Sequence, residues 1–516
     1  MDQKVSIFFS ERKVKFFLFL FILSILFFIS GARLVSSDEV SMYLTVENII
    51  KNGSFAIPFP DAPNSTTLDG KSYTWYEAGN IIAGIPMYLI GYGITSIISI
   101  SPSLSTLIIK AAVSLTSAFV GAWIAIMFYS LSRYYGVTRR LSVGMAIALI
   151  LTTFLLPYLK MFMREPILAL CMIGGTGYII RALKEKKSKD VIIAGIFIGY
   201  GILTKLAFVI NLLPLGLYIF WKIFTGKNDM KFSVLLKFSI PIILIGFMGT
   251  GLYNFIRFSN PLNTGYAGGT SFNIPFYVGM FGLLFSPGKG MFWFAPLLLL
   301  IFPTINEFRK HHRDETYLIG GMFIVNLILS SVYIAWGGDG SWGPRYLSPF
   351  LPLFFLMIAF YLNRAQKIVK QFAITLTVLG FIVQIGGISI YAGAYLREIG
   401  EYPYQKNFDD PEFLSKAHFI PNYSPIIGHW KMLKRNIGEH LEGNYPRLGI
   451  SQDTPDKRLP IGEEDRSKLL HTIDFWFTYG LSANIQGWII IVGIVLLASS
   501  ITVSAFGLQR SLSLKE

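Results

Sequence analysis

Long apolar runs are the feature that most constrains how this chain can fold. Many runs are dominated by Leu, Ile, Phe and Val, such as residues 14–32 and 371–391. A helix of about 20 apolar residues is long enough to cross the hydrocarbon core of a bilayer. Hydrophobic residues make up 53% of the chain, charged residues only 15%, and the mean hydropathy is +0.53. A soluble domain could not bury so much apolar surface, so the pattern predicts an integral membrane protein.

The positions of the basic residues indicate which side each loop faces. Most Lys and Arg residues fall in short loops between the apolar runs, which gives the chain a net charge of +15. Lys4, Arg12, Lys13 and Lys15 precede the first run, so the positive-inside rule places its start in the cytoplasm. The next loop, residues 33–77, has six acids against three bases, a balance that suits the external side. Because the positive charge follows membrane loops, no nucleic-acid partner is expected.

The apolar run 81–100 is long enough to span, but Gly84, Pro86, Gly91 and Gly93 interrupt it. If this run crossed the membrane, several later loops rich in Arg and Lys would lie outside. We therefore expect it to lie at the outer interface or to be re-entrant, where surrounding protein covers the broken backbone. About twelve spanning helices then remain, with both termini in the cytoplasm. They cover residues 14–32, 107–131, 141–159, 166–182, 191–205, 206–221, 238–255, 291–302, 317–335, 346–362, 371–391 and 485–506.

The predicted fold class is therefore an all-α polytopic membrane protein, and no internal repeat is evident. We expect a first membrane module at residues 1–257, whose external loop 33–105 carries interfacial helices. Residues 258–395 are expected to form a second transmembrane module with external loops. The polar stretch 396–480 reads as a small external subdomain, and residues 481–516 as a final transmembrane helix with a cytoplasmic tail.

Ionisable residues inside or beside the apolar runs are costly and are candidates for function. With the topology above they gather on the external side, and they come from five separate segments: Asp38 with Glu39, Arg164 with Glu165, Lys205, Arg257, and Asp339 with Arg345. Each also has a purely structural interpretation. Arg and Lys at helix ends often extend to lipid headgroups, and an acid beside a proline can complement a helix N-terminus.

Several other kinds of chemistry find no support in the sequence. No Walker loop, HExxH pair or GxSxG elbow is present, and the external histidines are too widely spaced for a metal motif. Cys171 is the only cysteine, so an intrachain disulfide is excluded. The sequons that begin at Asn64 and Asn422 are interpreted as chance occurrences.

Four segments, in their order along the chain, are similar to a known superfamily. DEVSMYLTVENIIKNGSF follows the first helix, an interfacial helix comes next, FMREPILAL holds a second acid, and GIFIGYGILTK ends in a basic residue. This order resembles the GT-C glycosyltransferases that use polyprenyl-phosphate sugars. This group contains the protein O-mannosyltransferases and the lipid A aminoarabinose transferase. The later segments NFIRFSNPLNTGY, LLFSPGKGMFWFAP and WGGDGSWGPRYL resemble prokaryotic members of the same superfamily. The chain departs from the aminoarabinose pattern where YEAGN replaces a Lys-Pro step, and Lys71 or Glu77 are candidates to substitute there.

The resemblance implies a GT-C-like bundle and an inverting transfer of sugar from a polyprenyl-phosphate donor to an acceptor hydroxyl or phosphate on the extracytoplasmic face of the cell membrane. It implies that Asp38 is the base and that Glu165 orients the sugar or acceptor. A divalent ion held between these two acids is left open, and no other cofactor is expected. A leaving phosphate requires fixed cations, for which Lys205, Arg345 and Arg257 are the candidates. Supporting contacts are expected from Glu39, Tyr43, Asp339 and Tyr346.

Two other functions remain as alternatives. The chain could be a transporter or flippase of lipid-linked sugars, although transporters place ionisable groups near the midplane and often show repeats. It could also be a surface-polysaccharide polymerase or ligase, which acts on the same class of donor. The sugar and the acceptor, whether glycan, lipid or protein, are not predicted.

Overall fold

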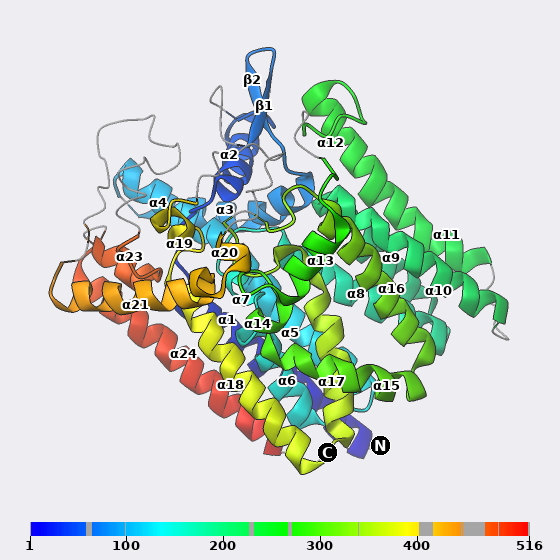
Figure 1. Ribbon diagram of the computed structural model, residues 1–516. Coiled ribbons are helices and arrows are strands. Elements are labelled where there is room, and N and C mark those ends of the chain that lie inside the picture. Colours follow the sequence, from blue (N-terminus) through cyan, green and yellow to red (C-terminus); the bar gives the residue numbers. More distant parts are fainter. Residues whose placement is uncertain are drawn as a thin grey trace.

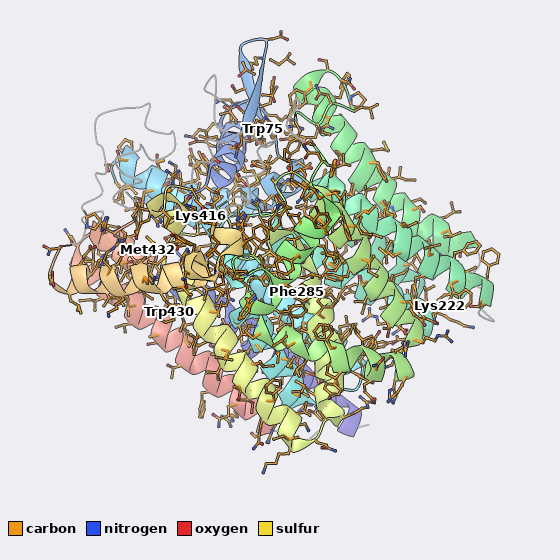
Figure 2. The ribbon with its side chains drawn as sticks, viewed as in Figure 1. Trp75, Lys222, Phe285, Lys416, Trp430 and Met432 are labelled. Atoms are coloured by element: carbon orange, nitrogen blue, oxygen red, sulfur yellow. The ribbon has the colours of Figure 1, made fainter. Side chains whose placement is uncertain are left out.

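The computed structural model describes residues 2–57, 64–98, 100–225, 232–266, 271–338, 340–401, 416–444, 446, 470–482 and 485–513. These residues form a bundle of long helices with one two-stranded sheet. Figure 1 shows the two chain ends close together, at the ends of the helices farthest from that sheet. Figure 2 shows Trp75, Lys416 and Met432 toward one side of the molecule and Lys222 toward the opposite side. Residues predicted to be external and cytoplasmic therefore lie apart.

Each segment expected to span the membrane is helical. By length and composition, nine helical segments of the described residues could each cross a membrane; eight belong to this set and the ninth is α3 (Ala78–Ile97). Other passes are shorter or divided. The set consists of α1 (Asp2–Ile29), α4 and α5 (Pro102–Ser114, Thr116–Tyr134), α6 and α7 (Arg139–Leu151, Leu156–Leu159), α8 (Glu165–Glu185), α9 (Ser188–Thr204), η1 and α10 (Leu206–Asn211, Leu212–Thr225), α11, η2 and α12 (Phe232–Pro241, Ile242–Met248, Gly249–Phe258), α14, η3 and α15 (Met291–Phe294, Pro296–Leu300, Ile301–His311), α16 (Arg313–Val332), η4 and α17 (Arg345–Phe350, Leu351–Arg364), α18 (Lys367–Ser389) and α24 (Gly487–Ser513). The all-α polytopic fold class is confirmed.

Helices α3 and α4 pack beside each other at the end of the bundle that carries the sheet (Figure 1). The start of α3 is buried, whereas its later part exposes apolar side chains such as Ile90 and Ile97. Helix α4 ends at a break at Leu115, after which α5 begins. Since α3 is long and apolar enough to cross a membrane, its position at the outer interface stays a prediction.

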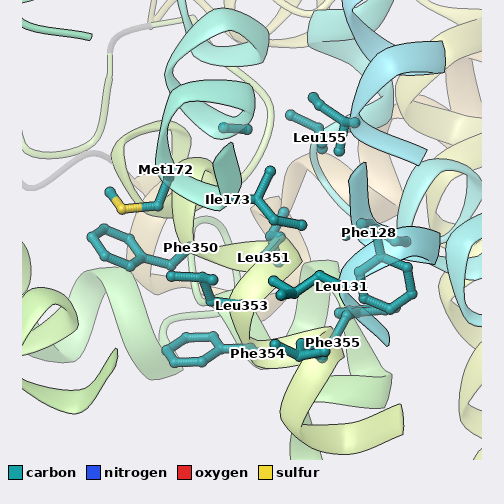
Figure 3. Close-up of a cluster of buried hydrophobic side chains, with 14 of the residues drawn as sticks. Phe128, Leu131, Leu155, Met172, Ile173, Phe350, Leu351, Leu353, Phe354 and Phe355 are labelled. Carbon is teal, nitrogen blue, oxygen red and sulfur yellow. The ribbon is translucent and has the colours of Figure 1, made fainter. Parts of the chain in front are cut away.

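Helices α5, α8 and α17 form the centre of the bundle. Figure 3 shows Leu131, Met172, Ile173, Leu351 and Phe355 packed there. Between helices in lipid the stabilisation comes from close van der Waals packing, because lipid tails are as apolar as leucine. Helices α8 and α17 begin at Glu165 and, through η4, at Arg345, so the rigid centre of the bundle positions two of the predicted site residues.

The loop after the first helix contains a well-capped helix, α2 (Ser37–Asn52). Ser36 caps its start: the hydroxyl accepts from the backbone N–H of Glu39, and the Glu39 carboxylate accepts from the backbone N–H of Ser36. This reciprocal pair is a capping box. Gly53, with φ of 65°, ends the helix in the left-handed conformation that glycine adopts most easily. Asp38 and Glu39 therefore lie in the first turn of α2.

The same loop contains a β-hairpin that the sequence analysis did not predict. Strands β1 (Ser65–Leu68) and β2 (Lys71–Thr74) pair antiparallel, with Ser65 opposite Thr74. Asp69 and Gly70 connect them with φ of 50° and 73°. An Asp-Gly pair with both φ values positive is a strong hairpin signal.

The stretch predicted as an external subdomain is described only in part. It contains α20 (Lys416–Phe419), η6 (Pro421–Tyr423), α21 (Pro425–Leu441) and α23 (Trp476–Ser482), preceded by α19 (Ala394–Glu398). The carboxylate of Asp474, just before α23, hydrogen-bonds Arg33 and lies 3.1 Å from Nζ of Lys160. This buried group joins the stretch to the ends of α1 and α7.

Candidate functional site

Three predicted residues from distant segments meet at the end of the bundle that carries the sheet. Arg345 donates through Nε to Oε1 of Glu165 at 2.6 Å and through Nη2 to Oδ2 of Asp38 at 3.1 Å. Glu165 is 1% exposed and Arg345 is 8% exposed. Glu165 is the first residue of α8, Arg345 is the first residue of η4, and Asp38 lies in the first turn of α2. A planar guanidinium suits this bridging of two carboxylates.

Asp38 has further donors besides Arg345. Nδ2 of Asn64 lies 2.9 Å from its Oδ1 atom, and the Tyr76 hydroxyl also hydrogen-bonds the carboxylate. Burial raises the pKa of Asp38, but the charge of Arg345, the Tyr76 hydrogen bond and the charge of Arg164 outweigh it, so the pKa lies below its usual value. Asp38 is therefore held as a carboxylate.

Glu39, its neighbour, faces away from Arg345. Oε2 of Glu39 accepts from the backbone N–H groups of Val35 and Ser36 and from the Ser36 hydroxyl, while Oε1 accepts from the backbone N–H of Phe162 at 2.8 Å. Burial raises the pKa of Glu39 despite these hydrogen bonds. Its contacts tie the start of α2 to the segment before α8, and thereby hold Asp38 near Glu165.

Lys205 and Arg345 line one cavity with Glu165. The cavity offers about 50 Å³ to water-sized groups and lies between α8, η1, α16 and η4. Nζ of Lys205 lies 4.3 Å from the ring centre of Tyr346, which also lines the cavity. Leu168, Met172, Leu329 and Pro349 contribute apolar wall, and Asn326 and Ser330 contribute polar groups. The cavity therefore combines cationic, polar and apolar walls.

Glu77 holds the backbone beside Lys205. Its Oε1 atom accepts from the backbone N–H of Leu206 at 3.0 Å, and its Oε2 atom accepts from Nη1 of Arg164 at 2.6 Å. At Gly79 a Cβ atom would lie 2.6 Å from Cα of Thr204, so only glycine allows α3 to approach the end of α9 this closely. Glu77 thus occupies the place where the resemblance expects a Lys-Pro step.

Acids and bases balance within this cluster. Asp38, Glu77 and Glu165 face Arg164, Lys205 and Arg345. Buried charges are tolerated when they are paired and hydrogen-bonded. An anion that entered the cavity would meet Lys205 and would compete with Asp38 and Glu165 for Arg345.

The remaining predicted residues are placed differently. Arg257 donates to the carbonyl oxygen of Thr74 and to Oδ1 of Asn254, so it braces the base of the hairpin. Tyr43 is buried in α2, with its ring 6.1 Å from that of Tyr88. Asp339 lies outside the described residues. In the part of the chain that the structure describes, no group of three or more His, Cys, Asp or Glu residues could hold a metal ion.

Two residues of the site were missed by sequence reasoning. Asn64 was interpreted only as a chance sequon, and Tyr76 was not singled out. The Asp69-Gly70 turn could have indicated both residues. It predicts a hairpin over β1 and β2, and Asn64 and Tyr76 lie on the two sides of this hairpin beside α2.

The apolar helices define a multi-pass membrane protein. The buried charged cluster forms a polar site at the end of the bundle that carries the sheet. Residues 81–259 match the family described as dolichyl-phosphate-mannose-protein mannosyltransferase. The matched stretch contains Glu165, Lys205 and Arg257 but neither Asp38 nor Arg345. Over these residues the match confirms the predicted resemblance to membrane glycosyltransferases that use polyprenyl-phosphate sugars.

No curated protein matches the chain. Among solved structures, ArnT from Cupriavidus metallidurans in the apo state is 12% identical, with a TM-score of 0.48 over 95% of this chain and 73% of that chain. The same protein bound to undecaprenyl phosphate is 12% identical, with a TM-score of 0.47 over 94% of this chain and 76% of that chain. The apo oligosaccharyltransferase of Archaeoglobus fulgidus is 13% identical, with a TM-score of 0.43 over 89% of this chain and 59% of that chain. All three TM-scores lie below 0.5, and no inference about function is drawn from them.

Proposed function

We propose that the protein transfers one sugar from a polyprenyl-phosphate donor to an acceptor hydroxyl at the extracytoplasmic face of the cell membrane, with inversion at the anomeric carbon. The observation that carries the proposal is the Asp38–Arg345–Glu165 arrangement beside the cavity that Lys205 lines. A base and a cation site for a leaving phosphate are the two requirements of this reaction, and here they adjoin. The extracytoplasmic side follows from the basic loops at the opposite ends of the helices.

Asp38 is the proposed general base. The acceptor oxygen forms a bond to the anomeric carbon, its proton passes to Asp38, and the bond from that carbon to the phosphate oxygen breaks with the electron pair leaving on the polyprenyl phosphate. A positioned carboxylate can take the proton as the oxygen attacks. Glu165 keeps Arg345 in place and orients the sugar or acceptor.

Lys205 and Arg345 are the proposed cations for the phosphate. Both line the cavity, and fixed cations in a site shielded from water stabilise developing negative charge more strongly than they would in water. Arg257, which braces the hairpin through Thr74, has a positioning role in this proposal. The apolar cavity wall between α8 and α16 accepts the beginning of the prenyl chain.

In this scheme the donor and Asp38 compete for Arg345. The phosphate draws Arg345 toward the cavity, and Asp38 loses its strongest ion pair. A carboxylate without this partner has a higher pKa and is a better base. Donor binding therefore prepares the base for the acceptor.

The test is to incubate the purified protein with a panel of labelled polyprenyl-phosphate sugars and acceptors of several classes. We expect one donor to lose its sugar and a glycosidic bond to form. In proteoliposomes, movement of lipid-linked sugar across the bilayer without any new glycosidic bond would replace the proposal with the flippase alternative. Chain growth on a lipid-linked glycan would favour a polymerase or ligase.

A further inference from the structure

Asn64 occupies a backbone position that only a few residue types adopt readily. Its φ is 52°, in the left-handed region where asparagine is enriched among non-glycine residues. Its carbonyl oxygen accepts from the backbone N–H of Trp75 at 2.9 Å, which closes the hairpin. The backbone of Asn64 is thus fixed by the sheet, and its side chain projects from a rigid base.

The side chain of Asn64 points at Asp38. Nδ2 lies 2.9 Å from Oδ1 of Asp38, 2.9 Å from the Ser37 hydroxyl and 3.0 Å from the Tyr76 hydroxyl. A carboxylate only accepts hydrogen bonds, so the amide nitrogen must face it. Asn64 is therefore a neutral donor to the carboxylate oxygen that Arg345 does not bind.

We propose that Asn64 is a positioning residue that keeps Asp38 aimed at the acceptor after Arg345 has turned to the donor phosphate. The inference rests on the proposed function. The groups that face Asp38 are Arg345 from η4, Arg164 at the start of α8, and Tyr76 and Asn64 on the two sides of the hairpin. Of these, only the arginines carry charge, and Arg164 is paired with Glu77.

A neutral donor suits this role for a physical reason. An ion pair orients a carboxylate strongly but also weakens it as a base, because it stabilises the charged form. A neutral hydrogen bond orients the group with a smaller effect on its pKa. Once Arg345 moves, Asn64 and Tyr76 retain the orientation while Asp38 becomes basic enough to take the proton.

The experiment compares two substitutions that both tolerate a positive φ. Asn64→Gly removes the amide and leaves the backbone relaxed; Asn64→Asp keeps the shape but replaces the donor with a second carboxyl. Thr67→Ala, within the hairpin, and Asn52→Gly, at the exposed end of α2, are the controls. Measured quantities are kcat, the donor KM and the pH dependence of kcat, together with the melting temperature.

For Asn64→Gly we expect kcat to fall about tenfold to a hundredfold, the range for losing a hydrogen bond to a charged group. We expect an unchanged donor KM and an acid limb shifted to higher pH, because the carboxylate has lost a stabilising donor. For Asn64→Asp we expect a larger loss at neutral pH that is partly reversed as the pH falls, since the paired carboxyls then share a proton. Both controls should retain the wild-type profile.

Two outcomes separate the failure of this inference from failure of the proposed function. If the wild-type protein forms no glycosidic bond with any donor, the proposed function falls. If the wild-type protein is active and folded Asn64→Gly has the wild-type kcat and pH profile, the positioning role alone is wrong. A kcat loss of equal size in Thr67→Ala would also overturn it, because the effect would then belong to the hairpin as a whole.

Discussion

Arg345 and Glu165 form a hydrogen-bonded ion pair, with 2.6 Å between Nε and Oε1, across 180 residues of sequence. The pair joins the first residue of η4 to the first residue of α8. Because Nη2 of the same guanidinium reaches Asp38, one side chain connects both proposed functional acids. Its fork-shaped group is therefore required, and a point charge would not replace it.

The substitution Arg345→Lys tests this requirement. A lysine keeps the charge but cannot bridge two carboxylates, so we expect kcat/KM to fall about a hundredfold or more. Arg364→Lys, at the end of α17 away from the cluster, is the matched control and should remain near wild type. Equal activity of the two variants would show that only the charge at residue 345 matters.

Lys205→Met tests the cation beside the cavity. Methionine keeps an unbranched apolar side chain of nearly the same length but removes the ammonium group, so we expect the donor KM to rise about tenfold or more, as for a lost charge-assisted contact. Lys71→Met removes an exposed lysine at the hairpin turn and serves as the control. If Lys71→Met raises the donor KM instead, the donor contact lies at the hairpin.

Glu39→Gln tests the structural role of the second acid. Glu39 accepts from four donors, and an amide would turn an N–H toward some of them, so we expect a loss of about 2 kcal/mol in the free energy of unfolding. Glu47→Gln breaks only a pair with the more exposed Lys51, worth about 0.4 kcal/mol. Thermal unfolding in detergent measures both, and equal melting temperatures for the two variants would contradict the assignment.

Asp474 provides a pH-dependent contribution to stability. Burial raises its pKa, but Arg33 and Lys160 outweigh this and lower the pKa to about 2 from 3.8. A lowered folded-state pKa stabilises the protein above the unfolded value, by about 2 kcal/mol here. This contribution disappears as the pH falls from about 4 toward 2.

The variant Asp474→Asn leaves two buried cations without their counter-charge, so we expect it to be destabilised at pH 7 by about 3 kcal/mol or more. Melting temperatures across a pH series measure the effect. The gap between wild type and variant should narrow as the wild-type carboxylate protonates. A gap that stays constant with pH would argue that the ion pairs contribute nothing.

The sequence allowed the membrane passes and much of the site to be predicted, because both depend on the apolar length of each segment and on the charge of the loops between segments. Apolar length marks a pass, and the basic loops mark its side. Counting sides brought Asp38, Glu165, Lys205 and Arg345 to the external face, where the structure has them in one cluster.

The contacts within the cluster could not be predicted in the same way. Arg257 lies at the same end of the bundle as the cluster, yet its guanidinium reaches Thr74 instead of the cavity. The charge rule assigns a loop to one side of the membrane but gives no distances between residues on that side. Asn64 depends on a hairpin in an otherwise helical chain, and on the register that sets Ser65 opposite Thr74. Contacts between residues far apart in the sequence, such as Arg257 with Thr74, depend on how the segments pack together.

The most direct test of the account is the turnover of Asp38→Asn, measured with the donor that the wild-type protein uses. Asparagine keeps the shape of the side chain but cannot accept the proton, so we predict that sugar transfer falls by at least about a thousandfold while the folded protein still binds donor. Asp69→Asn, in the hairpin turn, should transfer sugar at the wild-type rate. Wild-type turnover in Asp38→Asn would contradict the central claim that Asp38 is the base.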